Sequence, residues 1–352
     1  MAHNLNTIGG NATFIGRQAA WHKLGTVTGK YQTWDEIQAH GGFNFRPEKV
    51  QLSLDGAMVD AWGIRRSDNG AFLGPVGEAY TPIDHAQGFR LVDGLLESVN
   101  GAHYETAGVL GKGETVWGLA DLKASFTVGR DDVSNMYLLF ATSHNGTLSF
   151  SYWLTATRVV CQNTLRVATK AGSAFRVKHT RNSQTRIDEA HKALATIQGE
   201  TKSLSEKLNF LAQRKITRES LNSVMDKMFP KSKDDDGKAV ESVRRNNILI
   251  DVLQRFDHND GNAFPEQRGT AYNLLNAVTE FTDHSRSSRG DNGRAESALF
   301  GSGERLKSQA LEVLLETANG LPSVPVTQYV AQRVPVRSNV SLLDQVLEAH
   351  VG

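Results

Sequence analysis

Hydrophobic and polar residues alternate with a period of two in several stretches of the first half of the chain, as expected for β-strands with one buried face. The alternation over residues 116–121 predicts one such strand. Residues 133–142 and 147–155 predict a hairpin, because Asn145 followed by glycine favours the positive φ angles of a tight turn. Residues 175–180 alternate between apolar and polar, mostly cationic, side chains and predict a further strand.

Helical spacing begins with residues 158–171, which predict a helix that Gly172 would end. A longer amphipathic helix is predicted over 187–211, and its inward-facing seam would pack either against the chain's own helices or against another subunit. The seam residues recur every three or four positions: Ile187, Ala190, Leu194, Ile197, Thr201, Leu204, Leu208 and Leu211.

These patterns divide the chain into four regions and predict an α+β fold, with antiparallel hairpins in the first region. Residues 1–185 form a core of mixed strands and helices, and residues 186–230 hold the long helix and a short one that begins at Thr217. Residues 231–240 are a charged linker, and residues 241–352 are predominantly helical. Helices in the last region are predicted at about 241–256, 268–284, 303–318 and 341–350.

Composition indicates a folded chain that needs no disulfide bonds. Of the 352 residues, 39% are hydrophobic and 22% charged, and there is one cysteine, Cys161. A single cysteine excludes an intrachain disulfide and a cysteine-cluster metal site. No apolar run reaches the length of a membrane span and the first residues lack a secretory pattern, so we expect a cytoplasmic protein that does not bind membranes.

Charge is balanced over the whole chain but unevenly distributed along it. Lys and Arg number 39 and Asp and Glu 38, yet residues 133–187 contain no acidic residue. The same segment contains several cations, which favours an anionic partner, most readily a polyanion such as nucleic acid. A solvated basic surface, paired with acids from elsewhere in the fold, would have the same composition.

The predicted elements arrange these cations into a candidate nucleic-acid interface. Neighbouring cations would contact phosphates, and nearby aromatic side chains would stack on bases, as in single-strand binders that tolerate many sequences. The phosphate-binding residues expected are Arg158, Arg166, Lys170, Arg176, Lys178, Arg181 and Arg186, and the stacking residues expected are Tyr152, Trp153 and Phe175.

Enzymatic chemistry has weaker support in the sequence. The glycine turn at 111–113 lacks the first glycine and the Ser or Thr of a phosphate-binding loop, and no G-x-S-x-G motif occurs. Cys161 follows two valines, which is typical of a small buried residue rather than a nucleophile activated by His144 or His179. We therefore expect no catalytic residues and no cofactor.

One cluster has the residue types of a metal site. Glu280 and His284 are four residues apart on a predicted helix, with Asp283 beside them, so they could bind a divalent ion together. A surface ion pair or a buried polar contact would produce the same spacing. We expect no resident metal and keep these three residues as the alternative.

A series of short motifs occurs in a fixed order: Trp21–Gly25, Gly77–Ile83, Thr115–Trp117, Thr157–Leu165, His179–Thr180, Met228–Pro230, Gly269–Asn273 and Thr282–His284. In that order they resemble the phage/plasmid-like family of unassigned function, found in bacteriophages, plasmids and integrated elements. The likeness covers about residues 15–315, and the 157–165 motif is its most specific part. Tyr272 stands where the family would have tryptophan.

The resemblance implies a mobile-element origin without an established activity, and a remote similarity to the single-strand annealing recombinases of phages, which hold DNA in a basic groove. With the acid-free segment, it favours a non-enzymatic, homo-oligomeric protein that binds single-stranded DNA and promotes annealing or recombination in a bacterial host. One alternative is a phage protein that binds a host protein through the 187–211 helix. The other is a metal-dependent nucleic-acid enzyme that uses Glu280, Asp283 and His284.

Overall fold

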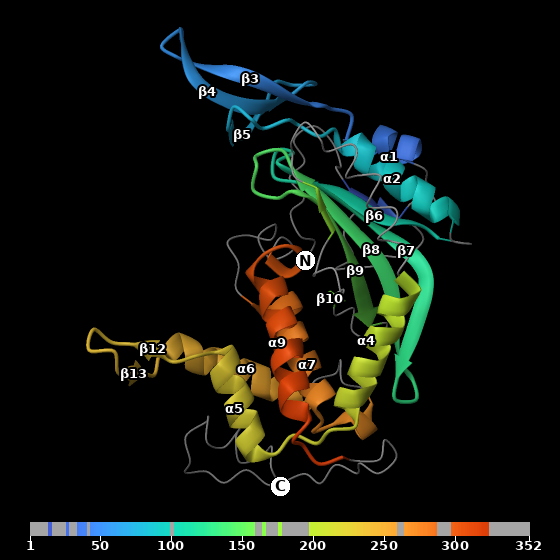
Figure 1. The fold of residues 1–352 in the computed structure, drawn as a ribbon, viewed down its shortest axis with the longest axis vertical. Coiled ribbons are helices and arrows are strands. Elements are labelled where there is room, and N and C mark those ends of the chain that lie inside the picture. The colour runs from blue at the N-terminus through green and yellow to red at the C-terminus, as the bar shows by residue number, and fades with distance from the viewer. Residues whose placement is uncertain are drawn as a thin grey trace.

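A long twisted sheet runs through the middle of the molecule, with a small sheet beyond one end and helices around the other (Figure 1). The fold is α+β, as the sequence predicted. None of the described helices is both long and apolar enough to cross a membrane. The structure, a computed structural model, describes residues 13–15, 26–27, 34–40, 43–98, 102–158, 164–166, 175–177, 197–258, 264–286 and 297–323.

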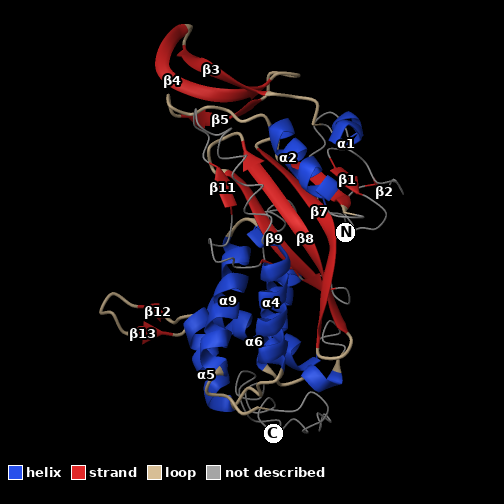
Figure 2. Cartoon of the chain, turned by 45° about the vertical axis from the view of Figure 1, so that its right-hand side comes forward, coloured by secondary structure: helices blue, strands red, loops and turns tan. Residues whose placement is uncertain are grey.

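The large sheet has the strand order β10-β9-β8-β7-β6-β1-β2, and β11 also pairs with β9 (Figure 2). Its strands pair antiparallel, except that β1 and β2 are parallel. The strands are β1 Thr13–Ile15, β2 Thr26–Val27, β6 His103–Leu110, β7 Thr115–Val128, β8 Asp132–Ser143, β9 Phe150–Arg158, β10 Thr164–Arg166 and β11 Phe175–Val177.

The strand over 116–121 and the hairpin are confirmed, although the hairpin connection between Ser143 and Phe150 is wider than the tight turn predicted. The strand predicted over 175–180 is confirmed for residues 175–177, which form β11, and residues 178–180 lie outside the described part of the chain. Residues 116–121 lie within β7, and the predicted hairpin is the β8–β9 pair. Gly146 in the connection has a φ of 77°, a conformation that glycine adopts without strain. The side chain of Asn145 closes the turn by accepting hydrogen bonds from the backbone N–H and the hydroxyl of Thr147.

The predicted helix over residues 158–171 is wrong in the part that the structure describes. Arg158 ends β9, and residues 164–166 form β10, antiparallel to β9. Leu165 is buried opposite Ala156, so pairing at the sheet edge decides the conformation. The β-branched residues of the segment carry the signal that periodicity missed, because they lower helix propensity and favour strands.

The small sheet, order β3-β4-β5, is joined to turns at one end of the large sheet by polar contacts. Arg66 donates to the carbonyl oxygen of Lys112 at 2.8 Å in the β6–β7 turn. Just beyond β5, Tyr80 donates to the carbonyl oxygen of Ser143 at the end of β8. The three strands are β3 Pro47–Leu54, β4 Ala57–Arg66 and β5 Phe72–Val76.

Helices α1 Trp34–His40 and α2 His85–Ser98 pack beside the large sheet through aromatic rings. Phe89 of α2 stacks on Trp34 at 4.0 Å and meets Phe140 of β8 edge-on at 4.5 Å. Gly88 lies so close to β9 that a Cβ atom at this position would be 1.7 Å from Cζ of Phe150. Glycine therefore allows α2 to lie directly against the sheet.

The remaining helices gather at the other end of the large sheet, where α7 contacts α4, α6 and α9 (Figure 1). Polar side chains tie this group to the β7–β8 turn. Asn209 of α4 accepts from the Gly129 N–H, and Tyr272 of α7 donates to the Asp132 carboxylate at 2.8 Å. The elements are α4 Ile197–Ala212, α5 Arg218–Met228, α6 Val243–His258, η1 Pro265–Gln267, α7 Ala271–Glu280, the π-helix η2 Phe281–Ser285 and α9 Ser302–Ala318.

The described part of the predicted apolar seam packs within the chain. Leu204, Leu208 and Leu211 of α4 are buried in the same apolar core as the sheet residues, and α4 packs on β7. Of the two alternatives for the seam, this part therefore faces its own chain, although its neighbours include a sheet as well as helices. Residues 187–196 lie outside the described part of the chain.

The cap at Thr217 is confirmed, because its hydroxyl accepts from the Ser220 N–H at the start of α5. Part of the predicted linker is a short hairpin, in which β12 Ser232–Lys233 pairs with β13 Ala239–Val240. The Asp234 carboxylate accepts from the Lys238 N–H and closes its turn. The helix predicted at 341–350 lies outside the described residues.

Candidate functional site

The acid-free segment contributes four neighbouring strands to the large sheet, β8 to β11. Within it, β10 and β11 both pair with β9, at Thr155–Thr157 and Phe150–Tyr152 respectively. The register places Arg166 opposite Thr155 and Arg176 opposite Ser151, while Arg158 is the last residue of β9. Strand positions of three predicted phosphate ligands are thus brought together around one strand. The other four, Lys170, Lys178, Arg181 and Arg186, lie outside the described residues.

The predicted stacking role of Tyr152 and Trp153 is wrong in this structure, because both side chains are only 2% exposed. Tyr152 packs 5.2 Å from the ring of Phe150, and Trp153 packs 5.6 Å from the ring of Phe300. Neither ring has a free face for a base. The sequence placed them on opposite faces of β9, but both faces of this strand are covered. Phe175 occupies the register position opposite Tyr152 in β11.

Glu280 and Asp283, two of the three residues of the alternative metal site, are engaged in ion pairs, which lowers the support for that alternative. Arg255 donates to Glu280, and Lys307 donates to Asp283 at 2.6 Å with both side chains buried. The helix also changes at this point: α7 ends at Glu280 and continues as the π-helix η2, which contains His284.

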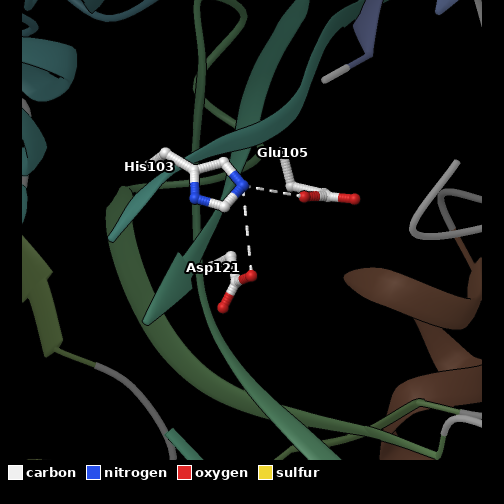
Figure 3. A group of neighbouring side chains, drawn as sticks. All are labelled: His103, Glu105 and Asp121. Carbon is white, nitrogen blue, oxygen red and sulfur yellow. Dashed lines mark hydrogen bonds and ion pairs between the residues drawn. The ribbon is translucent and has the colours of Figure 1, made fainter. Parts of the chain in front are cut away.

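A different group of metal-ligand residue types lies in the large sheet, at paired bulges of β6 and β7. His103 and Glu105 share one face of β6 with a single residue between them, and Asp121 is the register partner of His103. Figure 3 shows the imidazole turned toward both carboxylates, with Nε2 3.2 Å from Glu105 Oε2 and 4.0 Å from Asp121 Oδ2. We call these three residues the His103 group.

The charges of the His103 group can be balanced in two ways, which differ in the protonation of the imidazole. With a protonated imidazole, it forms a chain of ion pairs completed by Lys123, whose Nζ lies 2.7 Å from Asp121 Oδ2. With a neutral imidazole, one nitrogen and two carboxylates are suitable ligands for a divalent cation, in competition with Lys123. Burial raises the pKa of the neighbouring Tyr137, and the Glu105 and Asp121 carboxylates raise it further, so this phenol stays protonated.

A second positively charged feature lies among the helices. A cavity of about 670 Å³ is bordered by α5, α6, η2 and α9, and three arginines line it. Arg244 is in the first turn of α6, Arg286 directly follows η2, and Arg305 is in the first turn of α9. We call this cavity the arginine pocket. Apolar side chains, including Phe229, Ile248, Phe281 and Leu306, form the rest of its wall.

Sequence reasoning missed both the His103 group and the arginine pocket. The three arginines come from elements far apart along the chain, and acidic residues such as Glu241, Asp283 and Glu304 lie near them in sequence, so they do not form one continuous basic segment. In the His103 group, the pair His103 and Glu105 has the spacing that puts two side chains on one face of a strand. Their meeting with Asp121 depends on the β6–β7 register, which the sequence alone did not supply.

Comparison with known protein families gives one finding, and comparisons with curated proteins and with solved structures gave no match. Residues 72–300 match a domain of unknown function, DUF932. The matched segment runs from the start of β5 to Phe300, two residues before α9, and so includes β6 to β11, the His103 group and two of the three pocket arginines. Because the match spans more than half of the 352 residues, the protein belongs to the DUF932 family.

Proposed function

We propose that this protein binds single-stranded DNA without a catalytic step and promotes strand annealing during recombination of a phage or plasmid. In this proposal it acts as a homo-oligomer in the cytoplasm of a bacterial host. The observation that carries the proposal is the fold of the acid-free segment. Residues 133–187 contain no carboxylate, and the strands of this segment form adjacent parts of one sheet.

Strand pairing gives the proposed interface a direction. Arg166 and Arg176 stand opposite Thr155 and Ser151, so their positions are separated along β9 by four residues, or roughly 13 Å at the rise of a strand. Both of their strands pair with the same strand. Thr155 and Ser151 lie on one face of β9, so Arg166 and Arg176 occupy positions on that same face and would contact separate phosphates of one sugar-phosphate backbone. Arg158 alternates to the opposite face of β9 and lies outside this series.

The burial of Tyr152 and Trp153 changes the expected mode of binding. Without these stacking platforms, phosphate contacts supply most of the affinity, so binding should tolerate many sequences and depend strongly on salt. Because the net charge of the whole chain is close to zero, long-range attraction to duplex DNA should be weak. Binding would then depend on the cations gathered near β9.

The two rival functions lose support in the described part of the chain. A host-protein surface on the 187–211 helix would need the seam to face outward, but Leu204, Leu208 and Leu211 are buried. A metal-dependent enzyme built on Glu280 and Asp283 would need carboxylates that already bind Arg255 and Lys307.

The proposal is tested by fluorescence anisotropy with a labelled, unphosphorylated single-stranded oligonucleotide at 50 and 200 mM salt. Replacing both Arg166 and Arg176 with Gln should weaken binding and make the salt dependence shallower, by about 0.7 in log–log slope per lost phosphate contact. Arg218→Gln is the matched control, because Arg218 is an exposed arginine at the start of α5, outside the segment. Equal affinity and slope in wild type and double variant would refute the proposed interface.

A further inference from the structure

The arginine pocket concentrates positive charge that the described residues do not balance. Arg244, Arg286 and Arg305 form no ion pair with a described carboxylate, and Nη1 of Arg286 is buried without a hydrogen-bond partner. Asp251 also lines the cavity, but it accepts from Arg255 at 2.8 Å. Burial lowers the pKa of Arg286, and the charges of Arg244 and Arg305 lower it further. Three guanidinium groups that repel one another around a cavity would be stabilised by an anion.

The neighbouring arginine shows what an engaged guanidinium looks like here. Arg245 donates to the Phe229 carbonyl oxygen at 2.6 Å, to Glu241 at 2.9 Å, and to Asp226. Its donors are used to fix the end of α5 against α6. Arg244 precedes it by one residue and borders the pocket instead. The two consecutive arginines therefore have different roles, one structural and one available to a ligand.

Backbone groups add to the positive potential of the same cavity. The 16-residue helix α6 begins at Val243 and the 17-residue helix α9 begins at Ser302, and both residues line the pocket. The unpaired N–H groups of a helix N-terminus favour anions. One N–H group in each first turn is already engaged, since the Ser242 hydroxyl accepts from the Arg245 N–H in α6 and the Ser297 hydroxyl accepts from the Gly303 N–H in α9. The N-cap of α9 itself is Gly301, which has no side chain to accept from the others.

The remaining lining of the cavity selects for more than charge. Phe229, Ile248, Phe281 and Leu306 form an apolar wall, and the volume of about 670 Å³ lies within the usual range of small-molecule sites. A lone inorganic anion would leave this wall in water. A ligand that combines a multiply charged group with a flat, weakly polar ring would contact both the arginines and the apolar side chains.

We propose that the arginine pocket binds a nucleoside phosphate, with its phosphate groups between Arg286, Arg305 and the two helix N-termini and its base against the apolar wall. The ligand is either a free nucleotide or the 5′-phosphorylated end of a strand. This site is separate from the proposed interface on β9 to β11 and does not depend on it.

Isothermal titration of the full-length protein with ATP in 50 mM salt tests the proposal. Arg286→Gln and Arg305→Gln should each weaken binding at least about tenfold, because each removes charge-assisted hydrogen bonds to phosphate. Val243→Asp should also weaken it by placing a carboxylate at the pocket edge. Val243 is 78% exposed and begins a helix, where an acidic residue is favourable, so this variant should fold normally. Arg218→Gln should bind as the wild type does.

Further titrations separate the charged part, the base and the two ligand sources. Pyrophosphate should bind at least about tenfold more weakly than ATP, since it leaves the apolar wall unused. If a 5′-phosphorylated trinucleotide binds in an Arg286-dependent way and ATP does not, the strand end is the ligand. The proposal is overturned if neither ATP nor the phosphorylated trinucleotide binds, if the pocket variants bind as well as wild type, or if pyrophosphate matches ATP. Binding of unphosphorylated oligonucleotides tests the proposed interface on β9 to β11 separately, because these oligonucleotides lack the terminal phosphate that the pocket would bind.

Discussion

The buried ion pair between Lys307 of α9 and Asp283 of η2 makes a strong prediction about stability. Its atoms are 2.6 Å apart, and the side chains are 2% and 0% exposed. Lys307→Met keeps the length of the side chain but removes the ammonium group, leaving a carboxylate without its cation in the protein interior. Breaking a buried pair in this way costs about 3–5 kcal/mol, a large fraction of the free energy of unfolding of a typical domain.

The measurement is urea unfolding followed by circular dichroism, for Lys307→Met, Asp283→Leu and the double variant. The double variant should recover most of the loss, because replacing both charges with apolar groups is often close to neutral. A double-mutant cycle then gives a coupling energy of about 2–3 kcal/mol between the two positions. A loss below about 1 kcal/mol for Lys307→Met would refute the description of this contact as a buried ion pair.

Three further predictions concern stability. Gly88→Ala should lower the free energy of unfolding by about 2 kcal/mol, because overpacking against Phe150 outweighs the gain in helix propensity. Gly199→Ala, with nothing within 4 Å of its Cβ, should raise it by up to about 1 kcal/mol. Chemical denaturation that shifts the free energy of unfolding in the same direction for both variants would contradict this. Burial raises the pKa of Asp257 to about 7, so its folded form retains a proton that the unfolded chain releases, and stability falls as pH rises from about 4 to 7. Asp257→Asn should therefore raise the melting temperature at pH 8 and leave it nearly unchanged at pH 4, and an equal effect at both would count against it. Thr217→Ala should cost about 1 kcal/mol by removing the cap of α5, measured against an exposed mid-helix control, Ser223→Ala.

Local patterns in the sequence predicted the elements whose conformation is decided by their own residues. The β8–β9 hairpin follows from alternation on both sides of Asn145 and Gly146, and the start of α5 follows from the hydroxyl of Thr217. Residues 158–171 failed because their spacing suits a helix as well as a strand. Hydrogen bonds to the edge of β9 make residues 164–166 a strand, and the sequence of this segment alone does not show that such an edge is available.

The candidate sites depended on contacts between distant segments, and so they were less predictable. The acid-free segment was visible as composition, but alternation could not show that both faces of β9 are covered and that Trp153 meets Phe300. The spacing of Glu280 and His284 was visible, but Lys307, which binds the intervening Asp283, comes from another helix. The arginine pocket is bordered by four elements whose packing is set by the core, and no sequence motif joins them.

The contacts at the β7–β8 turn have a consequence for how this chain is made and handled. Residues 129 and 132 are held by Asn209 and Tyr272, which leave the ribosome 80 and 140 positions later. During synthesis the β7–β8 turn therefore lacks its contacts with α4 and α7 until most of the polypeptide has emerged from the ribosome. A recombinant fragment ending near residue 185 would lack Asn209 and Tyr272, so its β7–β8 turn would stay uncovered. We expect this fragment to aggregate under conditions in which the full-length chain does not.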